Sequence, residues 1–427
     1  MHTWVMTLVL AAAPPQVSGN ELSPRPDADV LPSSVSRDEV LELVRTRSPS
    51  LQSLAAEVEV VRSEEVQARL RPNPELRYMG YGRLHGTAQA INGQQHQVEA
   101  GFPLLIGGQS RTRRRAAEAR TRASEAQSCV DTTWIAREGL EQFVALLTAQ
   151  ERLAILEEGD LALAATEELT LARASVGAQT KFDALRVATE RETFAVDLSD
   201  ARSARIDAAA RLAGVIGAPH WRPQAVGSLE PDQPGTRDGA TGPPIPGQEL
   251  PAVQSAIRMQ DAAAAEHRAA RRERWPVPEV WFGTYLTTDG NSSSLVGGIR
   301  LPLPILDRGQ GILARARAVE RAAAARRTEV ERSAAAELRR GLDVLAERRT
   351  AALTFQRSAL ARAPELRTMA REAYRGGVSR VLDLLDAERA WLAVRLRWID
   401  LLERLALAEL DVQFADGTLG RRLCEPR

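Results

Sequence analysis

Apolar residues near the end of the chain recur at the spacing of a packed helix. From Leu384 to Val412 they follow steps of three and four residues over four heptads, which is the pattern of a coiled-coil seam. A second stripe repeats at strict seven, at Leu385, Leu392, Ile399 and Ala406. A helix with two apolar stripes suits a ring of helices lying side by side, although a core helix of an ordinary bundle would show the same pattern.

The segment 104–218 contains no proline and is rich in good helix formers. We expect one helix that ends near Ala174, a turn around Gly177, and a second helix that starts at Thr180. The first helix would be roughly 100 Å long at about 1.5 Å per residue, which is too long for a compact domain. The start of the second helix is supported by Asp183, which lies three residues after the candidate N-cap, Thr180.

The same arrangement of residues occurs again 200 positions later in the chain. A second long helical pattern begins near Gly309, breaks at a double glycine and is followed by the final helix, so that Gly177 corresponds to Gly377 and Asp183 to Asp383. Pro364 lies inside this second pattern and predicts a kink or an early break.

Two segments that alternate apolar and polar residues are predicted to form β-hairpins. The first follows a helix expected over Ser36–Leu70, capped by its first residue and divided at Pro49. Within the hairpin Val98 and Phe102 alternate with polar or small neighbours, which is typical of a strand with two unlike faces. The second hairpin lies near 279–302. Both hairpins follow a P-x-P-E sequence, and both end at a proline.

Helix, hairpin, long helix, turn and helix therefore occur twice in the same order. We assign residues 20–218 to a first structural repeat and 250–415 to a second. The Pro- and Gly-rich stretch 219–249 is expected to be a linker or an irregular surface segment, and the tail 416–427 is expected to be frayed. Residues 1–19 resemble a signal peptide, but no basic residue precedes the apolar run, so a disordered start in a cytosolic protein is an alternative.

The predicted strands are short and lie among many of the aromatic residues of the chain. Strands of about nine to eleven residues with unlike faces are also what transmembrane β-barrels use, with aromatic girdles at both interfaces. Open sheet edges are not tolerated in lipid, so several copies would have to close such a barrel together. The alternative is two hairpins packed on a soluble helical body. The candidate girdle residues are Tyr78, Tyr81, Phe102, Trp281, Phe282 and Tyr285.

Composition and motif content exclude several classes of function. The formal net charge is zero, which argues against a nucleic-acid-binding protein. The five histidines form no metal-spaced cluster, and no phosphate-binding loop or nucleophile motif is present, so we expect no catalytic residue, cofactor or metal site. A disulfide between Cys129 and Cys424 is one alternative, but it is not favoured because 295 residues separate the two cysteines.

These features together resemble the TolC-like outer membrane efflux proteins. The resemblance covers about 36–414 and depends most on Tyr374–Ala387, which reads Y-x-x-G followed by D-x-x-D-A. It implies a mixed α and β fold that is mostly α. Each chain of a homotrimer would give four strands to a twelve-stranded outer-membrane β-barrel and its helices to a long periplasmic tunnel.

The resemblance also implies a function and partners. The chain would be the outer-membrane exit duct of a tripartite efflux or type I secretion system, joined to a periplasmic adaptor (membrane fusion protein) and an inner-membrane transporter, without catalysis of its own. Drugs, metal ions and secreted proteins would all use the same kind of duct. A soluble coiled-coil scaffold is the alternative function. Strands placed twice between long helices argue against the scaffold, and against an adaptor subunit as well.

The resemblance also places site residues on this chain. Asp383 and Asp386 match the carboxylates that ring a closed pore entrance, Asp183 matches the acidic position of the first turn, and Tyr374 matches the same periplasmic tip. Rings of carboxylates favour cations at a constriction, although acids in the first turns of a helix also favour the helix dipole without further role. Ser379 departs from members that carry a tip-locking arginine. The predicted tip turns are Gly177, Gly376 and Gly377.

Overall fold

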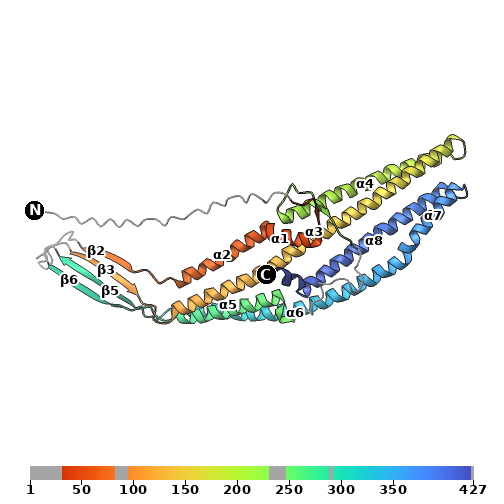
Figure 1. The fold of residues 1–427 in the computed structure, drawn as a ribbon. Helices are drawn as coiled ribbons and strands as arrows, with labels where there is room; N and C mark the ends of the chain where they lie inside the picture. Colours follow the sequence, from red (N-terminus) through yellow and green to blue (C-terminus); the bar gives the residue numbers. More distant parts are fainter. Residues whose placement is uncertain (1–30, 82–94, 230–246, 288–291, 425–427) are drawn as a thin grey trace, which may run out of the picture.

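The computed structural model describes residues 31–81, 95–229, 247–287 and 292–424. The described chain is elongated, with a small β-sheet at one end, long helices along its length, and two helical hairpins that turn at the other end (Figure 1). The expected signal peptide, residues 1–19, lies outside the described residues.

The first half of the chain follows the predicted order of elements. Ser36 caps the first helix with a capping box, since its backbone N–H donates to Glu39 Oε2 at 2.7 Å and its hydroxyl accepts from the Glu39 N–H. Pro49 is the first residue of the next helix, where its missing N–H has no intrahelical partner to lose. The elements are α1 (Arg37–Arg47), α2 (Pro49–Arg69), β2 (Glu75–Tyr81), β3 (Gln95–Pro103), α3 (Gln109–Ser175) and α4 (Lys181–Ile216).

The second half repeats this order with one interruption. The break expected at Pro364 is confirmed as a π-helical turn that ends at Leu360, whose carbonyl the missing proline N–H would otherwise have bonded. No helix in the described ranges is both long and apolar enough to cross a bilayer. The elements are η1 (Gly247–Glu249), α5 (Pro251–Glu273), β5 (Glu279–Thr287), β6 (Ser292–Arg300), α6 (Gln310–Phe355), η2 (Gln356–Leu360), α7 (Ala361–Arg375) and α8 (Val381–Ala415).

The two hairpins join into one antiparallel sheet with two unlike faces. The strand order is β2-β3-β5-β6, and Val98 of β3 lies opposite Thr284 of β5 where the hairpins meet. One face of the sheet carries charged residues: Arg300 Nη1 lies 3.0 Å from Glu279 Oε2, and Glu99 is buried beside this pair. The apolar face is exposed in the single chain and carries Leu76, Tyr78, Val98, Phe102, Val280, Phe282, Leu286, Leu295 and Ile299.

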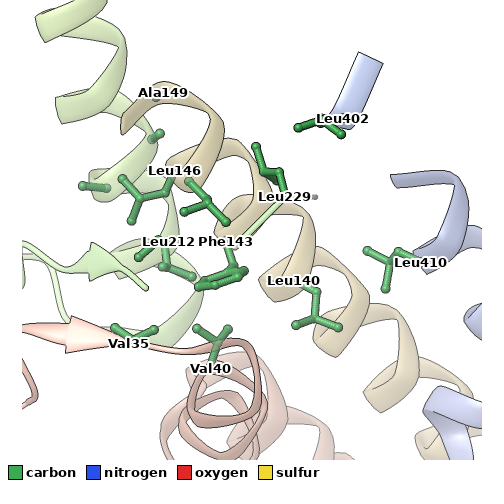
Figure 2. Packing of buried hydrophobic residues seen from close by; sticks show 14 of the residues in the cluster. Val35, Val40, Leu140, Phe143, Leu146, Ala149, Leu212, Leu229, Leu402 and Leu410 are labelled. Atoms are coloured by element: carbon green, nitrogen blue, oxygen red, sulfur yellow. The ribbon is translucent and has the colours of Figure 1, made fainter. Parts of the chain in front are cut away.

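The main hydrophobic core lies midway along the molecule, where α1, α3, α4 and α8 meet. Figure 2 shows Val35 and Val40 beside Phe143 of α3 and Leu212 of α4, and all four are buried. Burying an aliphatic or aromatic side chain of this size contributes roughly 1.5–3 kcal/mol. The core therefore holds the base of the long helices, while the sheet and the helical turns project from it in opposite directions.

As far as Cys424 the C-terminal tail is ordered, contrary to the prediction that it frays. It forms α9 (Thr418–Cys424), in which Leu419 is buried against the main core. Cys424 forms a disulfide with Cys129 of α3, with 5.8 Å between the two Cα atoms. The expectation against this bond was wrong because α8 runs back along α3, so residues far apart in sequence meet in space.

Part of the predicted linker also belongs to the core. Trp221 is buried and its indole N–H donates to the carbonyl of Pro32 at 2.8 Å. Next to it, β4 (Gln224–Ala225) pairs in parallel with β1 (Ser34–Val35). Residues 219–229 therefore pack against the main core in the middle of the molecule. The strand pair was not predicted because two-residue strands leave no periodic pattern.

Candidate functional site

The two helical turns at the tip of the molecule have the same backbone structure. Gly177 and Gly377 have φ angles of 75° and 74°, which are left-handed values that favour glycine. In each turn the N–H of the residue after this glycine donates at 2.9 Å to the carbonyl five residues earlier, which closes the helix as in a Schellman motif. Gly376 has an ordinary helical φ of −74°, so only two of the three predicted turn glycines need to be glycine.

In the first turn, Asp183 is held by the residues that begin α4. The Thr180 hydroxyl donates to Asp183 Oδ2 at 2.7 Å, and the Asp183 N–H donates back to Thr180 Oγ1 at 3.1 Å. The hydrogen bond from Thr180 lowers the pKa of Asp183 below its ordinary value. Asp183 is therefore a capping carboxylate that also stays charged in mild acid.

In the second turn, Asp383 and Asp386 lie on the exposed side of α8. Asp383 Oδ2 accepts the backbone N–H of Arg380 at 2.9 Å, so it caps the helix as Asp183 does. The side chain of Asp386 is 68% exposed, and within the described residues its carboxylate pairs with Arg389 alone, at 3.4 Å. The structure brings the two carboxylates to one helix start, with Asp386 one turn further along and free to face a neighbouring chain or solvent.

Tyr374 is buried between the two hairpins and does not project from the tip. Its side chain is 1% exposed, and its hydroxyl lies 2.9 Å from the Thr170 hydroxyl of α3. The Arg173 guanidinium stacks over the Tyr374 ring and donates to the backbone carbonyls of Tyr374 and Arg375 at 2.9 and 2.8 Å. These contacts hold the end of α7 against α3.

A buried charge cluster, which the sequence analysis missed, fastens α7 to α8 and α3. Arg367 Nε donates to Glu388 at 2.8 Å and its Nη1 donates to Glu158 at 2.7 Å. Arg371 also donates to Glu388, and the Arg367 guanidinium lies 3.6 Å from the centre of the Trp391 ring. The side chains of Arg367 and Glu388 are only 10% and 7% exposed. The sequence did contain a signal for this buried cluster, because Glu388 is a carboxylate inside the apolar stripe of α8.

One ion pair joins the starts of α4 and α8 directly. The Arg389 guanidinium binds both carboxylate oxygens of Glu190, with 2.7 Å between Nε and Oε1. Bonding to this cation lowers the pKa of Glu190. Equivalent regions of the two repeats are therefore tied to each other about two turns above the tip.

The predicted aromatic girdle is divided between the two faces of the sheet. Tyr78, Phe102 and Phe282 lie on the exposed apolar face, and the Phe102 and Phe282 rings stack with 5.5 Å between their centres. The alternation of side chains places the other three on the face that carries Glu99. Those three residues are Tyr81, Trp281 and Tyr285. The sequence could not separate the two sets, because register decides the face.

Nothing in the described ranges forms a metal centre: no group of three or more His, Cys, Asp or Glu side chains is placed to hold an ion.

Comparison with known proteins places this fold and sequence in one group. Residues 40–218 match the family model described as outer membrane efflux protein. The cobalt-zinc-cadmium resistance protein CzcC of Cupriavidus metallidurans is 26% identical over 392 residues, which is 89% of each chain.

Solved outer-membrane channels share the fold along nearly the whole chain. The CmeC outer membrane channel of Campylobacter jejuni superposes with a TM-score of 0.75 at 17% identity, over 89% of this chain and 85% of CmeC. A structure of CusC, solved in a study of transmembrane channel formation, gives a TM-score of 0.73 at 18% identity, over 89% and 92%. The match of the first repeat, the relative along the full length and the common fold agree with the residue-based resemblance, and residues 40–218 form a domain of the outer membrane efflux protein family.

Proposed function

We propose that three copies of this chain form one passive duct through the outer membrane, which carries substrates out from a pump and its adaptor. The observation that carries this proposal is the four-stranded sheet, whose one face is apolar and exposed while the other carries paired charges. An exposed apolar face of this extent suits lipid, and the charged face suits an aqueous channel. The duct needs no catalytic residue or cofactor, and we assign none.

The open edges of the sheet support assembly from several copies. Among the described strands, β2 and β6 each have a neighbour on one side only, and unpaired edges in hydrocarbon cost several kcal/mol for each unsatisfied group. Pairing β6 of one copy with β2 of the next would close the ring, and three copies of four strands would give twelve. The strands are seven to nine residues long, close to the length that spans a bilayer in tilted barrels.

The tip of the helices is the proposed constriction of the duct. Asp383 and Asp386 would each form a ring of three carboxylates, and Asp183 a further ring, all favouring cations. Tyr374 would act there through its packing against Thr170 of α3, not as a side chain exposed to the channel. Gly177 and Gly377 would make the sharp turns that bring the helix starts to the entrance.

The same tip is the proposed contact with the periplasmic adaptor, through which the inner-membrane transporter would deliver its cargo. Val176, Phe182 and Val378 are 78%, 68% and 86% exposed around the two turns. Apolar side chains gathered on an otherwise polar tip mark an interaction surface.

We further propose divalent metal cations as the cargo. The acidic tip would admit cations, and the relative CzcC, matched over 89% of its length, is named for cobalt, zinc and cadmium resistance. A strain that lacks the gene should become more sensitive to zinc and cobalt while its drug tolerance stays unchanged. The opposite pattern would remove the metal cargo and leave the duct in place.

Single-channel recording in a planar bilayer tests the duct itself. Protein extracted in detergent should have the mass of three chains and should insert to give a discrete, cation-selective conductance. Folded protein of one-chain mass that never conducts would contradict the proposal and would favour a coiled-coil scaffold.

A further inference from the structure

Just beyond the sheet, exposed apolar residues continue the lipid-facing stripe into the connections to the helices. The apolar face of the sheet is formed by every second residue of each strand, and in the sequence apolar residues keep this spacing past Pro103 and Arg300, where β3 and β6 end. We call the continuing residues the collar. They are Leu104 and Ile106 before α3, and Leu301, Leu303 and Ile305 before α6, which are between 40% and 72% exposed.

Each connection that carries the collar is hydrogen-bonded to the end of α5 or to the segment that leads from α5 to β5. The Leu104 N–H donates to the Pro278 carbonyl at 2.7 Å, and Arg274 Nε donates to the Arg308 carbonyl at 2.9 Å. The two parts of the collar thus both lie next to this segment, at the ends of the strands whose apolar face is proposed to contact lipid.

Three arginines without carboxylate partners lie directly next to this collar. Arg111, Arg115 and Arg272 help to line an open hollow of about 790 Å³ whose other wall includes Leu105 and Ile106. All three are exposed, and none makes a side-chain hydrogen bond or ion pair within the described residues. We call these three residues the arginine belt.

No acid lines the hollow, and two acids close in sequence to the arginine belt pair with other arginines. Glu118 pairs with Arg114 at 3.0 Å, and Glu273 pairs with Arg113 at 2.5 Å. The hollow therefore keeps an uncompensated positive charge on a face that borders apolar side chains. Apolar residues followed by unpaired cations are typical of a surface that lies at the boundary between acyl chains and anionic headgroups.

The distances suit one layer of lipid headgroups. At about 1.5 Å per residue, Arg111 lies roughly 3 Å and Arg115 roughly 9 Å along α3 from its first residue, Gln109. A headgroup layer is roughly 5–8 Å thick, and an arginine side chain can bend back toward it while its stem covers apolar surface. Both side chains can therefore reach the phosphate level when the collar lies at the acyl boundary.

We propose that the collar and the arginine belt form a binding surface for anionic phospholipids in the periplasmic leaflet of the outer membrane. The apolar collar would contact the acyl chains, and Arg111, Arg115 and Arg272 would hold the phosphate groups, for which the planar guanidinium is well suited. This inference rests on the outer-membrane placement of the protein and adds a lipid preference to it.

Native mass spectrometry of the full-length protein in detergent tests this surface. Phosphatidylglycerol and phosphatidylcholine with the same acyl chains would be added to the wild type and to Arg111→Gln/Arg115→Gln/Arg272→Gln. Because each arginine near a charged lipid contributes about fivefold, the triple variant should lose on the order of a hundredfold in preference for phosphatidylglycerol. The control Arg332→Gln/Arg339→Gln/Arg357→Gln removes the same charge from exposed, unpaired arginines of α6 and η2 and should keep the wild-type preference.

Three outcomes would overturn the lipid surface. They are no preference for phosphatidylglycerol in the wild type, an unchanged preference in the triple variant, and an equal loss in the control. If the triple variant fell apart into single chains, the arginine belt would belong to a contact between copies and the proposal would also fail. Bilayer conductance separates this failure from that of the duct, since a triple variant that conducts normally but ignores lipid charge leaves the duct intact.

Discussion

The helical hairpin of α3 and α4 and that of α7 and α8 turn through the same backbone structure but are held in different ways. The turns at Gly177 and Gly377 match in φ and in hydrogen bonds. However, α3 is continuous for 67 residues, whereas the corresponding long helix of the second repeat is divided into α6 and α7 by the π-helical turn η2. The second hairpin instead uses a buried charge cluster and Tyr374 to hold α7 in place. The two repeats thus share the structure of the turn and differ in what fastens each hairpin.

The largest expected difference between the hairpins lies in their charge clusters. Glu388→Ala should lower the stability of the protein by about 3 kcal/mol, because Arg367 would stay buried without its buried partner and would keep only the half-exposed Glu158. In the first hairpin, Arg191 pairs with Asp160 at 3.3 Å and is 41% exposed, so Asp160→Ala should cost no more than about 1 kcal/mol. Thermal unfolding of both variants in the same detergent measures the difference. Equal shifts in Tm would remove the distinction between the hairpins.

The two turn glycines should respond equally to substitution. Gly177→Ala and Gly377→Ala should each cost about 1–2 kcal/mol, since an alanine side chain disfavours the left-handed backbone while a Cβ would meet no atom within 4 Å. Gly376→Ala is the matched control and should cost less, because Gly376 has a helical φ. Unequal losses at 177 and 377 would show that the turns are not energetically equivalent.

Tyr374→Phe tests the hydroxyl contact that holds α7 of the second hairpin against α3 of the first. The variant should lose about 1 kcal/mol, because the Thr170 hydroxyl keeps its bond to the Thr166 carbonyl at 2.7 Å and is not left unsatisfied. If this contact helps to keep α7 against α3 in the closed tip, the single-channel conductance should rise as well. A drop in Tm with unchanged conductance would limit Tyr374 to a structural role.

The smallest expected effect concerns the ion pair between the hairpins. Because the pKa of Glu190 is lowered in the folded chain, the pair stabilises the protein above the unfolded pKa of about 4.3 and loses this effect as the pH falls through the lowered value. Arg389→Gln should therefore reduce stability by about 0.5 kcal/mol near pH 7 and should flatten the decline of Tm below pH 5. The control Arg397→Gln, on the exposed face of the same helix, should keep the wild-type pH dependence.

The sequence predicted the order of elements because periodicity, proline and glycine act locally. The starts at Ser36 and Thr180, the turns at Gly177 and Gly377 and the break before Pro364 all depend on neighbouring residues. Contacts between distant segments were not predictable in the same way. Cys129 meets Cys424, and Trp221 reaches Pro32, only because antiparallel helices bring these positions together.

The candidate site shows the same limit. Local pattern gave Asp183 and Asp383 as helix-start carboxylates, and the structure shows both in that position. The burial of Tyr374 and the pairing of Arg367 with Glu388 depend on which faces of α3, α7 and α8 meet. The division of the aromatic residues between two faces likewise depends on the register of the strands.

Ion selectivity of the single channel tests the central claim most directly. The comparison is between the wild type, Asp383→Asn/Asp386→Asn, and the control Asp343→Asn/Glu347→Gln, which removes two exposed acids from α6 far from the tip. Selectivity is measured as the reversal potential in a gradient of potassium chloride. We expect the tip variant to lose most of its cation preference while the control keeps it. An unchanged reversal potential in the tip variant would contradict the placement of the constriction at Asp383 and Asp386.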